Sequence, residues 1–254
     1  MKTLLTLLLT WSMAGSTLLA VDPDYSTWTR ILKTYYDPVH GMDYRGLRAK
    51  ELGALEAQRR VLSQIDVWQL TPKERLAYWL NLYNLTTVSL IVGRYPVTSI
   101  RDLSTDPFIR LNVFKRTQAT TRLGKVSLQD MEDVHLREAF KDPRIHFAIN
   151  CAARSCPPMR QEAFLGSRVD AQLEDQVRSF LTARRGITFE SATRIQLSKI
   201  FDWFHKDFQS WPGGIPAFLQ RHLPADSAGV IAKAGNTLRI DFDAYDWSLN
   251  DWQR

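Results

Sequence analysis

The stretch LTPKERLAYWLNLYNLTTVSLIVGRYP, residues 70–96, decides the fold, because it predicts one long helix that lies inside the protein. Thr71 is a typical N-cap, Pro72 suits the first helical position, and Glu74 completes a capping box. Gly93 lies near the predicted end of the helix. The residues between these signals are apolar on nearly every side, which is typical of a helix surrounded by other elements. We therefore expect a central buried helix of about twenty residues.

Polar side chains interrupt this helix at helical spacing. Glu74, Tyr78 and Asn81 fall on one stripe, and Asn84 follows three residues later. One interpretation is structural: Glu74 caps its own helix, and the asparagines satisfy carbonyl groups of nearby loops. The other is functional: the helix lines a cleft in which Glu74 orients an imidazole while Tyr78, Asn81 and Asn84 bind a ligand.

Shorter helices and strands are expected around the central helix. They alternate without a regular βαβ repeat, and no repeat or low-complexity linker divides the chain. We therefore predict an α+β fold, a helix-rich single domain at 21–254 around a small, mainly antiparallel sheet. The expected helices are at 26–35, 47–64, 128–140, 168–183, 200–209 and 215–222, and the expected strands at 111–115, 120–123, 145–149, 193–197 and 237–242.

The first twenty residues have the pattern of a signal peptide. Lys2 precedes an apolar run at 4–11, which is too short to span a bilayer, and small residues follow it. We expect a signal peptide at 1–20, a periplasmic or secreted location, and no stable membrane insertion after cleavage. A retained membrane anchor is the alternative.

Charge and composition exclude little else. The 254-residue chain has a formal net charge of +6 and a pI of about 9.4, but its basic residues are scattered. A phosphate-binding surface needs clustered cations. The sequence therefore predicts no nucleic-acid partner, and it predicts no cofactor.

Both cysteines of the chain lie in RIHFAINCAARSCPPM, residues 144–159. The alternation at 145–149 predicts a strand, in which His146 and Cys151 would face opposite sides. Small residues and Pro157 follow, so we expect a sharp turn at Asn150, and a bend there could bring His146 and Cys151 together.

Four interpretations of this pair remain open. Cys151 and Cys156 could form a disulfide in an oxidising compartment, or stay as inert buried thiols. They could hold a metal together with His146, although the C-x-x-C spacing of common zinc sites is missing. Alternatively, Cys151 is a nucleophile that His146 activates.

Four motifs resemble a known family. They are YWLNLYNLTTVSLIVGRYPVTSIRD, DPRIHFAINCAARSCPPM, LSKIFDWFHKDF and YDWSLN. Together they resemble the bacterial and plant family called domain of unknown function 547, over residues 40–250. The resemblance implies a helix-rich α+β domain related to papain-like and transglutaminase-like cysteine folds through a circular permutation. By position it implies a polar site made of Glu74, His146 and Cys151. Tyr78 departs from the family, in which Phe is usual.

These residues suggest acyl transfer by a thiol enzyme. Cys151 would attack a carbonyl, His146 would move the proton, and Glu74 would orient the imidazole. Asn81 or a backbone N–H would stabilise the oxyanion. The expected substrate is an amide or peptide of the cell envelope. The alternative is a non-catalytic envelope module that uses the same polar cleft to bind a ligand.

The last two motifs are expected to be structural. In LSKIFDWFHKDF the apolar residues recur at helical spacing, which predicts a packing helix. The alternative is a charged catalytic cluster of Lys199, Asp202, His205 and Asp207. The motif at 245–250 is expected to be a C-terminal clamp with Trp247 buried and Asp246 hydrogen-bonded.

Overall fold

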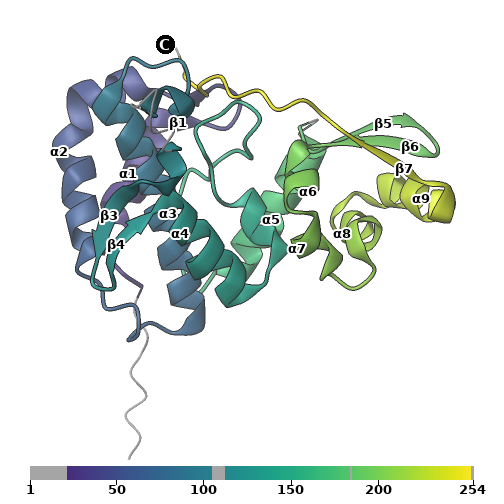
Figure 1. The fold of residues 1–254 in the computed structure, drawn as a ribbon, viewed down its shortest axis with the longest axis horizontal. Helices are drawn as coiled ribbons and strands as arrows, with labels where there is room; N and C mark the ends of the chain where they lie inside the picture. The colour runs from purple at the N-terminus through teal and green to yellow at the C-terminus, as the bar shows by residue number, and fades with distance from the viewer. Residues whose placement is uncertain (1–21, 105–111, 184, 253–254) are drawn as a thin grey trace, which may run out of the picture.

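The computed structural model of the chain describes residues 22–104, 112–183 and 185–252. The predicted signal peptide at 1–20 lies outside the described residues. Most of the described chain is helical (Figure 1). The α-helices are α1 (Ser26–Tyr35), α2 (Tyr44–Ser63), α3 (Pro72–Arg94), α4 (Leu128–Asp130), α5 (Val169–Thr182), α6 (Lys199–Trp203), α7 (His205–Gln209), α8 (Gly214–His222) and α9 (Ala225–Ala234).

The long central helix is confirmed as α3. The Thr71 side chain accepts from the backbone N–H of Glu74, and the Glu74 side chain accepts from the backbone N–H of Thr71, so the capping box is complete. The helix is buried along most of its length and packs against α2. Within the described ranges, no helix combines the length and apolarity needed to cross a bilayer.

The strands form three small sheets, and their pairing is mainly antiparallel, as predicted. The first two sheets are hairpins, whereas in the third β6 pairs with β5 antiparallel and with β7 parallel. The α+β class is therefore confirmed. The strands are β1 (Tyr36–Asp37), β2 (Gly41–Met42), β3 (Thr117–Thr121), β4 (Gly124–Ser127), β5 (Ile187–Ser191), β6 (Arg194–Leu197) and β7 (Arg239–Phe242).

Two hydrophobic cores meet near the middle of the chain. The first is built mainly from α1, α2 and α3, and the second from the sheet β5–β6–β7 and the helices α6 to α9 (Figure 1). Helix α5 and the short 3₁₀ helix η4 (Pro143–Phe147) contribute to both. In η4, Ile145 packs into the first core and Phe147 into the second. The segment that carries His146 therefore lies where the two cores meet.

The strand predicted at 145–149 is wrong, because this segment forms η4. The Asp142 side chain accepts from the backbone N–H of Arg144, and Pro143 occupies the first turn, so a capped helical start overrides the apolar alternation. A second 3₁₀ turn, η2 (Val113–Lys115), replaces the described part of the strand expected at 111–115. Residue 111 lies outside the described residues.

Two predicted helices are interrupted. The helix expected at 128–140 continues from α4 into a π-helical segment, η3 (Met131–Glu138). The helix expected at 200–209 breaks at Phe204 into α6 and α7. The strand expected at 120–123 covers only the end of β3 and the turn that follows it, and strands β1, β2, β4 and β5 and helix α9 were not predicted. Two further 3₁₀ turns complete the described secondary structure, η1 (Ile100–Leu103) and η5 (Gly235–Thr237).

The C-terminal segment after β7 crosses back from the second core to the first (Figure 1). The backbone N–H of Leu249 donates to the carbonyl of Thr98 at 2.8 Å, and that of Asn250 donates to the carbonyl of Ala152 at 3.0 Å. The Asp246 side chain accepts from the N–H of Ser248. These contacts have the form expected of a clamp, although Trp247 is only partly buried.

Candidate functional site

The loop that carries the two cysteines is held from α3. Asn84 donates from Nδ2 to the carbonyl of Ala148 and accepts from the backbone N–H of Asn150, both at 2.8 Å. The Asn150 side chain accepts from the N–H of Ala152, whose φ of 63° is left-handed. The sharp turn predicted after Asn150 is therefore present, and it directs Cys151 away from the core.

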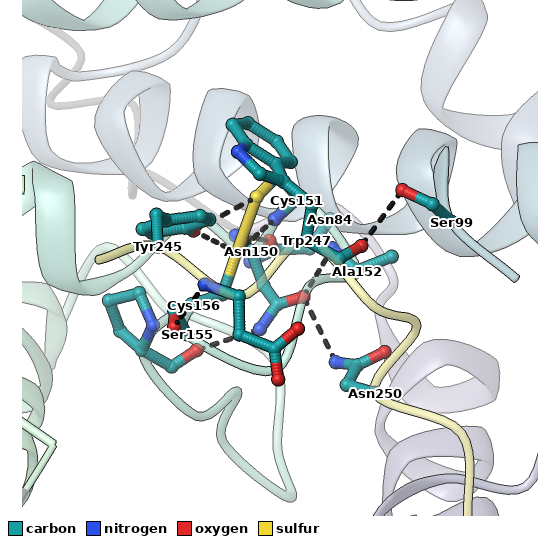
Figure 2. The surroundings of a disulfide bond; sticks show 12 residues. Asn84, Ser99, Asn150, Cys151, Ala152, Ser155, Cys156, Tyr245, Trp247 and Asn250 are labelled. Carbon is teal, nitrogen blue, oxygen red and sulfur yellow. Dashed lines mark hydrogen bonds between the residues drawn. A yellow bond between two sulfur atoms is a disulfide. The ribbon is translucent and has the colours of Figure 1, made fainter. Parts of the chain in front are cut away.

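Cys151 and Cys156 form a disulfide bond (Figure 2). Cys156 is buried, whereas Cys151 is partly exposed. The hydroxyl of Tyr245 lies beside both sulfurs, 3.3 Å from Cys151 Sγ and 3.0 Å from Cys156 Sγ. Of the four interpretations of the cysteine pair, the structure contains the disulfide. The described residues contain no group of His, Cys, Asp or Glu side chains arranged to hold a metal ion.

His146 is paired with a carboxylate from the second core. Its Nε2 lies 2.8 Å from Asp207 Oδ2, and its ring stacks on Phe204 with 4.0 Å between centroids. Nδ1 is buried and has no hydrogen-bond partner among the described residues. Because the carboxylate accepts a hydrogen bond from Nε2–H, the neutral imidazole presents a lone pair at Nδ1.

The surroundings of this pair determine the protonation states of His146 and Asp207. Burial lowers the pKa of His146 below its usual value, although Asp207 opposes this. Burial opposes ionisation of Asp207, but hydrogen bonds from His146 and Arg137 hold the pKa of that carboxyl well below its usual range. Arg137 Nε lies 2.7 Å from Asp207 Oδ2. At neutral pH, the site therefore holds an uncharged imidazole oriented by an ionised carboxylate.

His146 and both cysteines line one small cavity of about 180 Å³. The 3₁₀ turn η4 makes this possible, because in the predicted strand His146 and Cys151 would face opposite sides. The remaining wall is mostly apolar and aromatic. It is formed by Tyr83, Phe114, Glu132, Ile149, Pro157, Ile200, Trp203, Phe204, Tyr245 and Trp247.

A larger cavity adjoins the other side of the disulfide. Its volume is about 810 Å³, and Cys156 and Tyr245 line both cavities. Its wall carries basic and acidic side chains, including Arg154, Lys199 and Asp243. The disulfide and the Tyr245 ring thus stand between an aromatic cavity and a polar one.

The structure does not bring Glu74 to His146. The carboxylate of Glu74 accepts from the backbone N–H and the hydroxyl of Thr71, both at 2.9 Å. Glu74 lies ten residues before Asn84 on α3, which corresponds to about 15 Å along the helix axis. Its contacts are those of the capping box, and Asp207 occupies the orienting position instead.

The three predicted binding residues contact the backbone of neighbouring segments. Asn81 donates to the carbonyl of Phe164 at 2.8 Å and accepts from its N–H at 2.9 Å. Tyr78 donates to the carbonyl of Leu62 at 3.0 Å. Asn84 holds the cysteine loop as described. These contacts correspond to the structural interpretation of the polar stripe. They occupy the side-chain donors and acceptors with which these residues would bind a ligand.

The sequence reasoning missed three residues of the site: Asp207, Tyr245 and Glu132. Asp207 was assigned to one continuous packing helix, but the break at Phe204 changes the direction of α7. The available signal was the density of charged residues in LSKIFDWFHKDF. Tyr245 lies in the terminal motif, and Glu132 had no signal of its own.

Fold and site together define a helix-rich α+β protein in which His146, paired with Asp207, shares a cavity with a cysteine pair. Residues 67–181 match the model of the family described as "Protein of unknown function, DUF547", which confirms the family predicted from the motifs. The matched segment includes α3, His146 and the cysteine loop, and it ends before Asp207 and Tyr245. No curated protein and no solved structure matches the chain.

Proposed function

We propose that the reduced protein is a thiol-dependent hydrolase or acyltransferase in which Cys151 is the nucleophile, His146 the base and Asp207 the orienting carboxylate. One observation carries the proposal. His146 is held through Nε2 by Asp207 at 2.8 Å, its Nδ1 is buried without a partner among the described residues, and the residue lines the same cavity as Cys151. A nucleophile, a base and a group that orients the base form the usual triad of thiol catalysis.

The disulfide has to be reduced before this chemistry. Two-electron reduction by a dithiol breaks the bond between the sulfurs, leaves thiols on Cys151 and Cys156, and converts the dithiol into its own disulfide. Cys151 is the more exposed of the two, so its sulfur is the one that a substrate reaches. Tyr245, beside both sulfurs, then donates a hydrogen bond to the Cys151 thiolate.

The acyl transfer then follows from the geometry. The proton of Cys151 Sγ moves to His146 Nδ1, the thiolate attacks the amide carbonyl, and the proton passes to the nitrogen that leaves. The resulting thioester is cleaved by water or by an amine. The backbone N–H of Cys151, which contacts Cys156 Sγ at 3.0 Å, becomes an oxyanion donor when the reduced Cys156 moves away. Asn81, the other predicted donor, is engaged by Phe164.

The proposed substrate is an amide or peptide of the cell envelope. This rests on the signal peptide expected at 1–20, which places the protein in the periplasm or outside the cell. The disulfide supports that assignment, because such bonds form and persist in oxidising compartments. The polar cavity next to Cys156 has the volume and mixed charge to accept the rest of a peptide.

The disulfide favours a second candidate function. With Cys151 oxidised, the aromatic cavity could hold a ligand without any covalent step, as in a non-catalytic envelope binding module. Thiol reactivity separates the two candidates, because a binding module does not require an activated Cys151.

The test uses the variant Cys156→Ser, which leaves Cys151 as a single thiol. We expect iodoacetamide to alkylate Cys151 faster than free cysteine at pH 7, and Asp207→Asn in this background to slow the reaction roughly ten-fold or more. Asp226→Asn, on the exposed side of α9, is the matched control and should change nothing. Alkylation no faster than free cysteine would remove the enzyme proposal and leave the binding module.

A further inference from the structure

One carboxylate stands out in the aromatic cavity. Among the described residues that line it, Glu132 is the acidic one, and none is a lysine or an arginine. Glu132 belongs to the π-helical segment η3, a type of helix that is rare and often found at functional sites. Glu132 is half-buried, and the cavity that it lines has a wall made largely of rings.

Within the described part of the chain no basic side chain forms an ion pair with Glu132, although the charge of Arg137 acts on it. Tyr83 on α3 hydrogen-bonds its carboxyl. Arg137, on the same helix, forms its ion pairs with Asp133 and Asp207 instead. The ordinary arrangement for a buried carboxylate is a paired one, so the missing cation has to come from outside the chain or the group has to be protonated.

The charged groups around Glu132 make the unliganded carboxylate unfavourable. Burial raises the pKa of Glu132 to about 7, and Asp133 and Asp207 add to this effect while Arg137 opposes it. The neutral His146 and the Tyr245 hydroxyl also face the cavity. A bound cation would reverse this balance, because it stabilises the ionised carboxyl.

The aromatic wall is suited to a cation as well. Trp203, Tyr245 and Trp247 form one cluster, with ring centroids 4.7 to 5.8 Å apart. Cations bind favourably to the faces of such rings. Two rings of the wall already contact a cation of the protein itself, because Arg137 lies over Phe204 and Arg101 lies over Trp247. An apolar ligand alone would leave the carboxyl without a partner of opposite charge.

We infer that the cavity lined by Glu132, Trp203 and Tyr245 binds a primary alkylammonium group, such as the end of a lysine side chain. The cavity of about 180 Å³ is smaller than a typical drug-sized pocket. It corresponds to about six water volumes, which suits a short chain ending in an ammonium. The carboxylate pairs with the ammonium, and the rings cover its methylene groups.

The assignment of this group to a substrate rests on the proposed function. If the protein transfers acyl groups, its substrates carry a primary ammonium close to the reacting amide, or the amine is itself the acyl acceptor. Binding of the ammonium needs no thiol, so it can be tested on the disulfide form. Failure of binding and failure of catalysis are therefore separate results.

The experiment is calorimetry with n-butylammonium at pH 8, with 1-butanol as the uncharged probe of similar size. We expect the ammonium to bind at least ten-fold more tightly than the alcohol. Glu132→Gln should abolish this preference, and the exposed Glu138→Gln on the same helix should keep it. Equal binding of the two probes by the unmodified protein would overturn the inference without relying on any variant.

Two further measurements sharpen the result. The affinity for n-butylammonium should rise from pH 6 to pH 8 as Glu132 ionises, because the amine itself stays charged until about pH 10. Trp203→Ala should weaken binding several-fold, whereas Trp68→Ala, exposed outside the cavity, should not. A flat pH profile, or retained affinity in folded Glu132→Gln, would contradict the pairing with Glu132.

Discussion

The most informative stability experiment is the replacement Glu132→Gln, because the two side chains have nearly the same shape. Burial raises the pKa of Glu132 from its ordinary value of 4.5 to about 7. The folded protein therefore binds this proton more tightly than the unfolded chain does. Between pH 4.5 and 7 the stabilisation associated with the proton is lost as the pH rises. Above that window both states are ionised, and the folded state bears the cost of a buried charge.

The magnitude follows from the two pKa values. Each pH unit is worth about 1.4 kcal/mol, so the difference between 4.5 and about 7 corresponds to at most ~3.5 kcal/mol. Glu132 keeps part of its surface in the cavity, where solvent screens the charge, so we expect about 1 to 2 kcal/mol. Gln imitates the protonated form. Glu132→Gln should therefore be more stable than the unmodified protein at pH 8, and this gain should disappear by about pH 4.5.

The assay is denaturant unfolding of both proteins between pH 4.5 and pH 8, without any amine in the buffer. Comparing the two proteins at each pH cancels the contributions of His146 and Asp207, which titrate in both. Glu138→Gln is the control for removing a charge from the same helix. A variant that is less stable than the unmodified protein at pH 8, or a difference that does not depend on pH, would refute the reasoning.

Four other perturbations test the remaining roles. Glu74→Gln should cost about 1 kcal/mol or less, since Gln can close the capping box, and a changed alkylation rate of reduced Cys151 would speak against this. Asn84→Ala leaves a carbonyl and an N–H of the cysteine loop buried without partners, so we expect unfolding measurements to show a loss of about 2 to 5 kcal/mol; a loss under about 1 kcal/mol would contradict the anchor. Tyr245→Phe should slow alkylation of reduced Cys151, and an equal rate would remove the hydroxyl from the site. Deletion of residues 245–254 should lower the melting temperature, and an unchanged value would refute the clamp.

The central helix could be predicted because its signals are local. Thr71, Pro72 and Glu74 define the start of α3 by contacts within one turn, and tertiary packing does not oppose them. The polar stripe could also be recognised in the sequence, but the partners of its side chains could not be predicted. The partners of Asn81 are backbone groups 83 residues away, and no local rule indicates whether such a side chain faces a loop or a ligand.

The strand prediction at 145–149 was wrong for a different reason. Alternating apolar residues are a weak signal over so short a stretch, and Asp142 followed by Pro143 is a helix start. Both patterns are present in the sequence, and in the folded protein the capping pattern overrides the alternation. The error mattered, because the strand would have separated His146 from Cys151, whereas η4 lets both line the same cavity.

The identity of the orienting carboxylate was beyond local reasoning. His146 and Asp207 are 61 residues apart, and they meet because η4 lies where the two cores join. Tyr245 reaches the disulfide by the same route, on the segment that returns from the second core. The family match at 67–181 thus contains the cysteine pair and the imidazole, but neither Asp207 nor Tyr245. Because the cysteine loop packs on the first core while Asp207 and Tyr245 come from the second, the site exists only while the two cores are packed together.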